Sequence, residues 1–159
     1  MGSLPSTTPT LSSEPGRPLL LDDRVLVALL TGEALPRAVG AECFTTAYFY
    51  YRACRAVVIG AGGKLSGPFA RLDRTRRAHA LASMLGLPDE VRLPDPRDVV
   101  PVMVALSQRH PHLNVLATEA AAAALVLGAT MLIARATAEG QLGPVLEAED
   151  IAFIIIDLH

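Results

Sequence analysis

Residues 17–30 read RPLLLDDRVLVALL and combine a short apolar run with two adjacent acids. Residues 18–21 predict a buried strand, and residues 23–31 predict a helix, because their apolar side chains recur at helical spacing. Asp22 and Asp23 lie where the strand passes into the helix. An acid at that position either binds a metal ion at the end of a parallel strand or caps the helix. The choice between these roles depends on which other acids the chain brings to the same place.

The alternation of strand and helix continues along the chain and predicts the fold. Further strands are expected over residues 42–46, 89–95, 130–134 and 151–157, and the last, IAFIIID, has the apolar content of a buried parallel strand. Helices are expected over residues 33–40 (a short turn), 47–59, 71–85, 95–108, 115–127 and 141–148. This order predicts an α/β fold with a single doubly wound parallel sheet flanked by helices. Ligands of such sheets bind beyond the carboxyl ends of the strands.

Length and composition are those of one globular domain. The chain has 159 residues, of which 51% are hydrophobic, and a formal charge of −2. We expect a disordered N-terminal tail over residues 1–16 and one α/β domain over residues 17–159. The tail lacks the apolar segment of a signal peptide, so a cytoplasmic protein is expected, and the Arg- and Ala-rich composition suggests a bacterial one. A membrane span over residues 115–134 is the alternative, but Glu119 and Gly128 interrupt that segment.

Two further motifs bear on function. Residues 60–64, GAGGK, are similar to a dinucleotide-binding turn, but they follow a predicted helix and the third glycine of that pattern is missing. A helix end and loop is therefore the preferred interpretation. The basic cluster is either a phosphate-binding surface or a solvated helix face, and it lacks the interleaved aromatics of a single-strand binding platform. Its members are Arg71, Arg74, Arg76 and Arg77.

The order of elements and two motifs resemble the PIN domain, as found in toxin–antitoxin ribonucleases. The motifs are LLLDDRVLVALLTGE at residues 19–33 and HLNVLATEAAAAALVLGATMLIA at residues 112–134, and the resemblance covers residues 18–157. It implies a central parallel sheet flanked by helices. It also implies an active site in which carboxylates hold Mg²⁺ or Mn²⁺, and a metal-activated water hydrolyses RNA.

The acids of that active site are mostly missing from this chain. The first family aspartate falls on Asp22, whereas the other three positions fall on Tyr51, Ala117 and Arg135. Because a hard divalent cation needs several carboxylate oxygens, the resemblance implies a degenerate pocket with no cofactor, in which Arg135 pairs with Asp22. The alternative is a rearranged acid cluster of Asp22, Asp23 and Glu119, which would bind Mg²⁺ or Mn²⁺.

Three functions follow from these patterns. The first is a catalytically degenerate PIN-like domain that acts by binding RNA or a protein partner and that forms homo-oligomers, for example a homodimer. The second is a metal-dependent ribonuclease with the rearranged acidic site. The third is a module that binds a nucleotide or another small ligand through Asp22, Thr45 and Arg135. No membrane association is expected in any of them.

Overall fold

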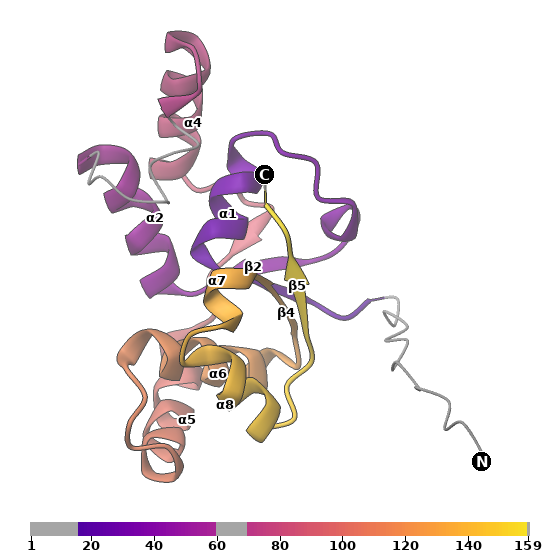
Figure 1. Ribbon diagram of the computed structural model, residues 1–159, viewed down its shortest axis with the longest axis vertical. Coiled ribbons are helices and arrows are strands. Elements are labelled where there is room, and N and C mark those ends of the chain that lie inside the picture. The colour runs from indigo at the N-terminus through magenta and orange to yellow at the C-terminus, as the bar shows by residue number, and fades with distance from the viewer. Residues whose placement is uncertain (1–15, 60–69, 159) are drawn as a thin grey trace, which may run out of the picture.

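The structure, a computed structural model, describes residues 16–59 and 70–158 (Figure 1). Its centre is a five-stranded sheet in which all neighbouring strands run parallel, in the order β3-β2-β1-β4-β5. The first strand therefore lies in the middle of the sheet, and the chain winds outward from it on both sides, as the predicted doubly wound α/β fold requires. The strands are β1 (Leu19–Leu21), β2 (Cys43–Thr45), β3 (Val91–Arg92), β4 (Thr130–Ala134) and β5 (Phe153–Ile156).

Helices cover both faces of the sheet, because alternate side chains of each strand point in opposite directions. Leu19 and Leu21 of the central strand pack with one group of helices, and Leu20 packs with the other. The first group occupies the upper half of Figure 1 and the second group the lower half. The first group is α1 (Asp23–Leu30), α2 (Ala47–Ile59) and α4 (Arg74–Leu85), and the second is α5 (Pro96–Arg109), α6 (Val115–Leu127) and α8 (Leu142–Ala148).

Short polar side chains fix where the helices begin. Asp22, Asp73, Asp95 and Asn114 each precede a helix, and each accepts a hydrogen bond from a backbone N–H of its first turn. Such caps satisfy N–H groups that have no partner inside the helix. At the other end of α6, Gly128 has a left-handed backbone with φ of 60°, and this ends the helix before β4.

Three elements differ from the predictions. The helix expected from residue 71 begins at Arg74, because Asp73 caps it, so Arg71 precedes the helix. The segment expected to form a buried strand becomes β5, which lies at the sheet edge and is only partly buried, because β4 is its one partner in the sheet. A one-turn helix, α7 (Arg135–Ala138), follows β4 and was not predicted. The short turn expected over residues 33–40 contains η1 (Pro36–Ala38).

The alanine-rich helix α6 lies inside the domain. Ala120–Ala124 are at most 2% exposed, and they pack in the core that α6 shares with α5 and α8. In the described parts of the chain, no helix is long and apolar enough to cross a lipid bilayer. Residues 1–15 of the predicted tail and the glycine-rich segment at 60–64 lie outside the described residues.

Candidate functional site

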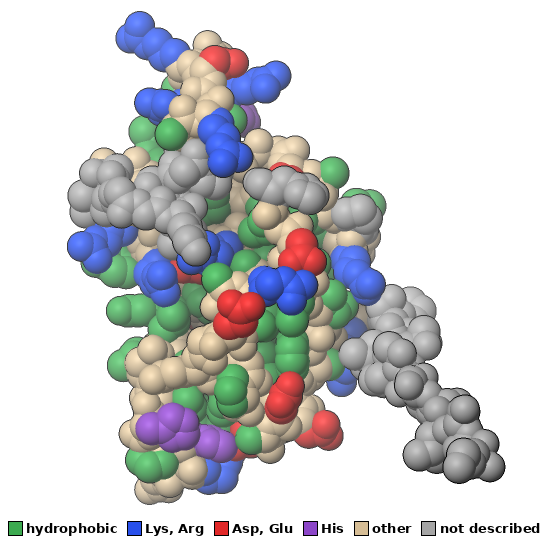
Figure 2. Space-filling view, viewed as in Figure 1, with side chains coloured by type: hydrophobic (Ala, Val, Ile, Leu, Met, Phe, Trp, Pro, Cys, Tyr) green, Lys and Arg blue, Asp and Glu red, His purple; other side chains and the backbone are tan. Residues whose placement is uncertain are grey.

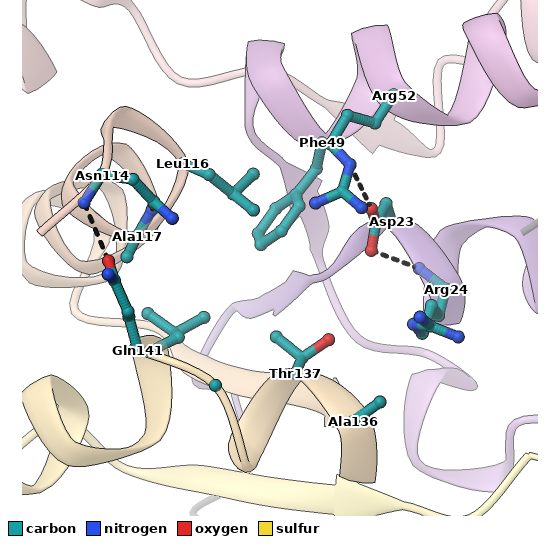
Figure 3. Close-up of a pocket in the computed structure, with 12 residues that line it drawn as sticks. Asp23, Arg24, Phe49, Arg52, Asn114, Leu116, Ala117, Ala136, Thr137 and Gln141 are labelled. Carbon is teal, nitrogen blue, oxygen red and sulfur yellow. Dashed lines mark hydrogen bonds and ion pairs between the residues drawn. The ribbon is translucent and has the colours of Figure 1, made fainter. Parts of the chain in front are cut away.

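A cavity of about 200 Å³ lies beside the carboxyl ends of β1 and β4, between α2, α6 and the turn from α7 to α8 (Figure 3). This is the edge of the sheet at which the sequence predicts a site. The lining combines one carboxylate, two guanidinium groups and several small polar and apolar side chains. It consists of Asp23, Arg24, Phe49, Arg52, Asn114, Leu116, Ala117, Ala136, Thr137, Gly140, Gln141 and Leu142.

Asp22 is fully buried and lies behind this cavity, where its carboxylate joins two elements. Its Oδ1 accepts a hydrogen bond of 2.7 Å from Val25 N, and its Oδ2 accepts one of 2.8 Å from Ala134 N. Burial raises the pKa of Asp22, while a hydrogen bond from the Thr137 side chain and the two backbone donors oppose that rise. Asp22 therefore caps α1 and ties it to the end of β4.

Asp23 is the acid that lines the cavity. It is 2% exposed, and its Oδ1 accepts a hydrogen bond of 2.9 Å from Arg24 N. Its Oδ2 lies 3.2 Å from Arg52 Nε as an ion pair, but it has no aligned hydrogen-bond donor among the described residues. Burial and the neighbouring Asp22 raise the pKa of Asp23 to about 6, although Arg52 and Arg24 favour its charged form. The cavity thus contains a buried carboxylate with spare hydrogen-bonding capacity.

The third candidate acid, Glu119, has a separate role. Its Oε1 accepts a hydrogen bond of 2.9 Å from Tyr48 N, in the first turn of α2. A carboxylate at this position stabilises the positive end of the helix. Glu119 does not line the cavity. Across residues 16–59 and 70–158, no group of three or more His, Cys, Asp and Glu side chains is arranged to hold a metal ion.

The predicted pairing of Arg135 with Asp22 is wrong. The Arg135 guanidinium instead makes two hydrogen bonds to Asp157, from Nε to Oδ1 at 2.9 Å and from Nη2 to Oδ2 at 3.1 Å. Asp157 directly follows β5, so this pair links the ends of two neighbouring strands at the surface. The oxygens of Asp22 have the backbone donors described above as partners in place of Arg135.

Of the four residues expected to form the degenerate pocket, Ala117 alone lines the cavity. Tyr51 is 55% exposed, and its ring stands 6.0 Å from that of Tyr48 on the surface of α2. The side chain that α2 directs to Asp23 is that of the next residue, Arg52. Sequence spacing offered a signal for it, since Arg52 follows the core residue Phe49 by three positions and so borders the buried face of α2.

The threonines at the end of β2 form hydrogen bonds with backbone groups. Thr45 Oγ1 donates a hydrogen bond of 2.9 Å to the carbonyl oxygen of Leu21, and Thr46 Oγ1 accepts one of 3.1 Å from Phe49 N. Both side chains are buried. The small-ligand site expected from Asp22, Thr45 and Arg135 is therefore not assembled, because these three side chains have separate partners and none lines the cavity.

The predicted basic cluster lies on and just before α4. Every residue from 73 to 79 is exposed, so the first turns of this helix have no buried face. Figure 1 shows α4 extending away from the body of the domain. Arg76 Nε lies 3.6 Å from Asp73 Oδ2, and Arg77 Nη2 donates a hydrogen bond of 3.4 Å to Ala70 O. Arg71 and Arg74 belong to the same exposed surface.

Charge is distributed unevenly along the chain. Residues 43–88 contain seven of the 14 Arg and Lys residues but one of the 16 acids, which gives this segment a formal charge of +6. The rest of the chain carries the balance of −8. Figure 2 shows arginine side chains gathered over the upper part of the molecule, around α2 and α4. A chain with a slightly negative total charge thus presents a strongly cationic region.

Comparison with known proteins gives few matches. No family model and no curated protein sequence matches this chain. Among solved structures, a chain of VapBC-1 from nontypeable Haemophilus influenzae is similar to it, with a TM-score of 0.49 and 10% sequence identity, over 86% of this chain and 96% of that one. The assignment of the α/β fold rests on the parallel strand pairing described above.

Proposed function

We propose that this chain is a PIN-like domain that binds single-stranded RNA without hydrolysing it. The observation that carries the proposal is the cationic surface of α4, where residues 73–79 are all exposed and include Arg74, Arg76 and Arg77. This N-terminal part of α4 presents cations and no buried face, whereas the C-terminal part of the helix packs in the core through Ala80 and Met84. The N-terminal part is well suited to a polyanion, because binding releases the counterions condensed on the phosphates.

Helix α2, which contacts the C-terminal end of α4, carries exposed aromatic side chains. Tyr48 and Tyr51 are 40% and 55% exposed. Arg55 lies one turn beyond Tyr51 and is also exposed. Unpaired bases stack on aromatic rings and on guanidinium planes, with little dependence on sequence. This combination favours a single strand, whose bases are free to stack, over a duplex.

The distribution of the acids supports binding without hydrolysis. Mg²⁺ and Mn²⁺ need oxygen ligands that are not already engaged. Both oxygens of Asp22 accept backbone hydrogen bonds, and Glu119 caps α2. Asp23 faces the cavity with Arg52 beside it, and that guanidinium would compete with a cation for the same oxygen. These residues therefore do not fit a hard divalent ion.

The proposal is tested by fluorescence anisotropy with a labelled single-stranded RNA over a range of salt concentrations. Arg74→Ala combined with Arg77→Ala should weaken binding. The slope of log affinity against log salt should also become shallower by about 0.7 for each phosphate contact removed. Arg97→Ala is the matched control, because Arg97 is equally exposed but lies on α5 in the acidic part of the chain. It should leave both affinity and slope unchanged.

Other outcomes identify other functions. Absence of salt-sensitive RNA binding, together with a stable complex with a protein partner or a second copy, would assign the domain to protein interaction. The ribonuclease alternative draws support from Asp23, whose carboxylate faces the cavity. Cleavage of the RNA in the presence of Mg²⁺ or Mn²⁺, lost on Asp23→Asn, would establish that alternative.

A further inference from the structure

The cavity beside Asp23 has the chemistry of a base-recognition pocket. We propose that it takes a guanine base, whose Watson–Crick edge lies against the Asp23 carboxylate and the Arg52 guanidinium. This inference rests on the proposed RNA binding and names the group that the pocket would read. Asp23 is 2% exposed and lines the cavity. Its Oδ2 lacks an aligned hydrogen-bond donor among the described residues.

A buried oxygen of this kind attracts a hydrogen-bond donor. A carboxylate has about four lone-pair positions, and Arg24 N and the Arg52 side chain are the neighbours that the structure gives to Asp23. An acceptor left without a donor in a buried place loses the hydrogen bonds that water would give it. A ligand that donates to Asp23 therefore gains more from this contact than it would at a solvated carboxylate.

The pairing of Asp23 with Arg52 restricts the base. Guanine carries two adjacent donors, N1–H and the N2 amino group, beside the acceptor O6. A carboxylate accepts from both donors, and the neighbouring guanidinium donates to O6. Adenine and cytosine each place a ring lone pair next to their amino group, which a carboxylate repels. Uracil has a single N–H between two carbonyl oxygens.

The position and size of the cavity suit a single base. The Asp23 side chain is 3% exposed and that of Arg52 is 40% exposed, so the ion pair extends from the interior toward solvent. Phe49, Leu116 and Ala117 supply apolar lining, and Figure 3 shows Phe49 and Leu116 across the cavity from Thr137 and Ala136. Pockets for drug-sized ligands hold roughly 300–1,000 Å³, whereas this one holds about 200 Å³. It is large enough for one planar base but too small for a dinucleotide.

The test is calorimetric titration of the full-length chain with GMP, IMP and AMP. IMP differs from GMP by loss of the N2 amino group, so this comparison needs no change in the protein. GMP should bind roughly tenfold more tightly than IMP or AMP, the discrimination expected from one good bidentate contact. Asp23→Asn and Arg52→Met should each reduce the preference for GMP. Asp98→Asn, an exposed acid on α5, is the control and should retain it.

The outcomes separate this inference from the proposed function. Equal binding of the three nucleotides, or no binding of any of them, would overturn the guanine pocket, and salt-sensitive binding of a guanine-free RNA would leave the proposed function standing. Selective GMP binding without RNA binding would support the guanine pocket and overturn the proposed RNA binding. Retention of the GMP preference in Asp23→Asn, with its folding checked by circular dichroism, would also overturn the guanine pocket.

Discussion

Asp22 and Asp23 are adjacent in the chain, but their carboxylates have different surroundings. Asp22 is enclosed by backbone donors from α1 and β4, so its charge is balanced by the fixed dipoles of the fold. Asp23 is equally buried but faces a cavity with an arginine beside it. Asp22 therefore stabilises the fold, whereas Asp23 can still accept a hydrogen bond from a ligand.

Asp22→Ala should destabilise the domain by about 2–4 kcal/mol. The substitution removes the cap of α1 and leaves the N–H groups of Val25 and Ala134 without their acceptor in the interior. Urea denaturation followed by circular dichroism measures the loss. Asp98→Ala, at an exposed position of α5, should change the free energy of unfolding far less. A loss below about 1 kcal/mol for Asp22→Ala would contradict this structural role.

Asp23 should make the domain less stable as the pH rises from about 4 to about 6. Its pKa is about 6 in the folded chain against 3.8 for the unperturbed group, so the folded state holds the proton more tightly over this interval. The penalty is absent below the unfolded pKa and complete above the folded one, where it reaches about 3 kcal/mol. Asp23→Asn removes this ionisation and should be the more stable protein at pH 7.

The measurement is the difference in unfolding free energy between the two proteins at several pH values. Taking the difference cancels the contributions of acids distant from the substitution, such as Glu149, whose pKa is lowered by Arg109 and His110. The difference should be small near pH 4 and grow toward pH 7. A difference independent of pH would show that Asp23 does not titrate as its burial requires.

Residue roles at the site could be predicted only in part from the sequence. Asp22 and Asp23 could be placed at the edge of the sheet, because strand ends and helix starts are local properties of the chain, whereas Ala117 was placed there by the resemblance to the PIN domain. The partners of the charged residues could not be predicted, since an ion pair depends on side chains from elements distant in sequence. Tyr51 was expected at the site where Arg52 lies, and one position along a helix turns a side chain by about 100°.

Helices and strands were predicted more accurately than contacts between side chains, but α7 is a helix that the sequence patterns missed. A helix of four residues, RATA, is too short for a periodic apolar pattern, so it could not be predicted from one. Yet α7 supplies Ala136 and Thr137 to the cavity. The packing of α7 on α8 therefore helps to position the site, although neither helix carries one of the predicted acids.

Gly143→Ala should disturb this packing. A Cβ at Gly143 would overlap the carbonyl oxygen of Ala138, a backbone atom that can yield only by moving α7. We expect a loss of about 1–3 kcal/mol in unfolding free energy, the usual cost of forcing an extra carbon into a packed position. Gly140→Ala is the control, because its Cβ would lie 3.5 Å from Thr137 O, an ordinary contact. Equal stability of the two variants would contradict the close approach of α7 and α8.

For the molecule as a whole, the two faces of the sheet differ in electrostatic character as well as in packing. The helices α2 and α4 on one face carry five arginines and no acid, whereas α5, α6 and α8 on the other face carry two arginines and three acids. Such a division gives a polyanion one preferred side to approach, and the preference weakens as salt screens the charges.

Photochemical crosslinking to a single-stranded RNA should therefore modify peptides from α2 and α4 and leave those from α5 and α8 unmodified. The exposed rings of Tyr48 and Tyr51 are the expected attachment points, because stacked bases lie against them. Mass spectrometry of the digested complex locates the crosslinks. Raising the salt concentration should reduce them in parallel with binding, and Tyr51→Leu should lower their yield more than it lowers affinity. Crosslinks confined to residues 96–149 would place the RNA on the acidic side and reject the proposed surface.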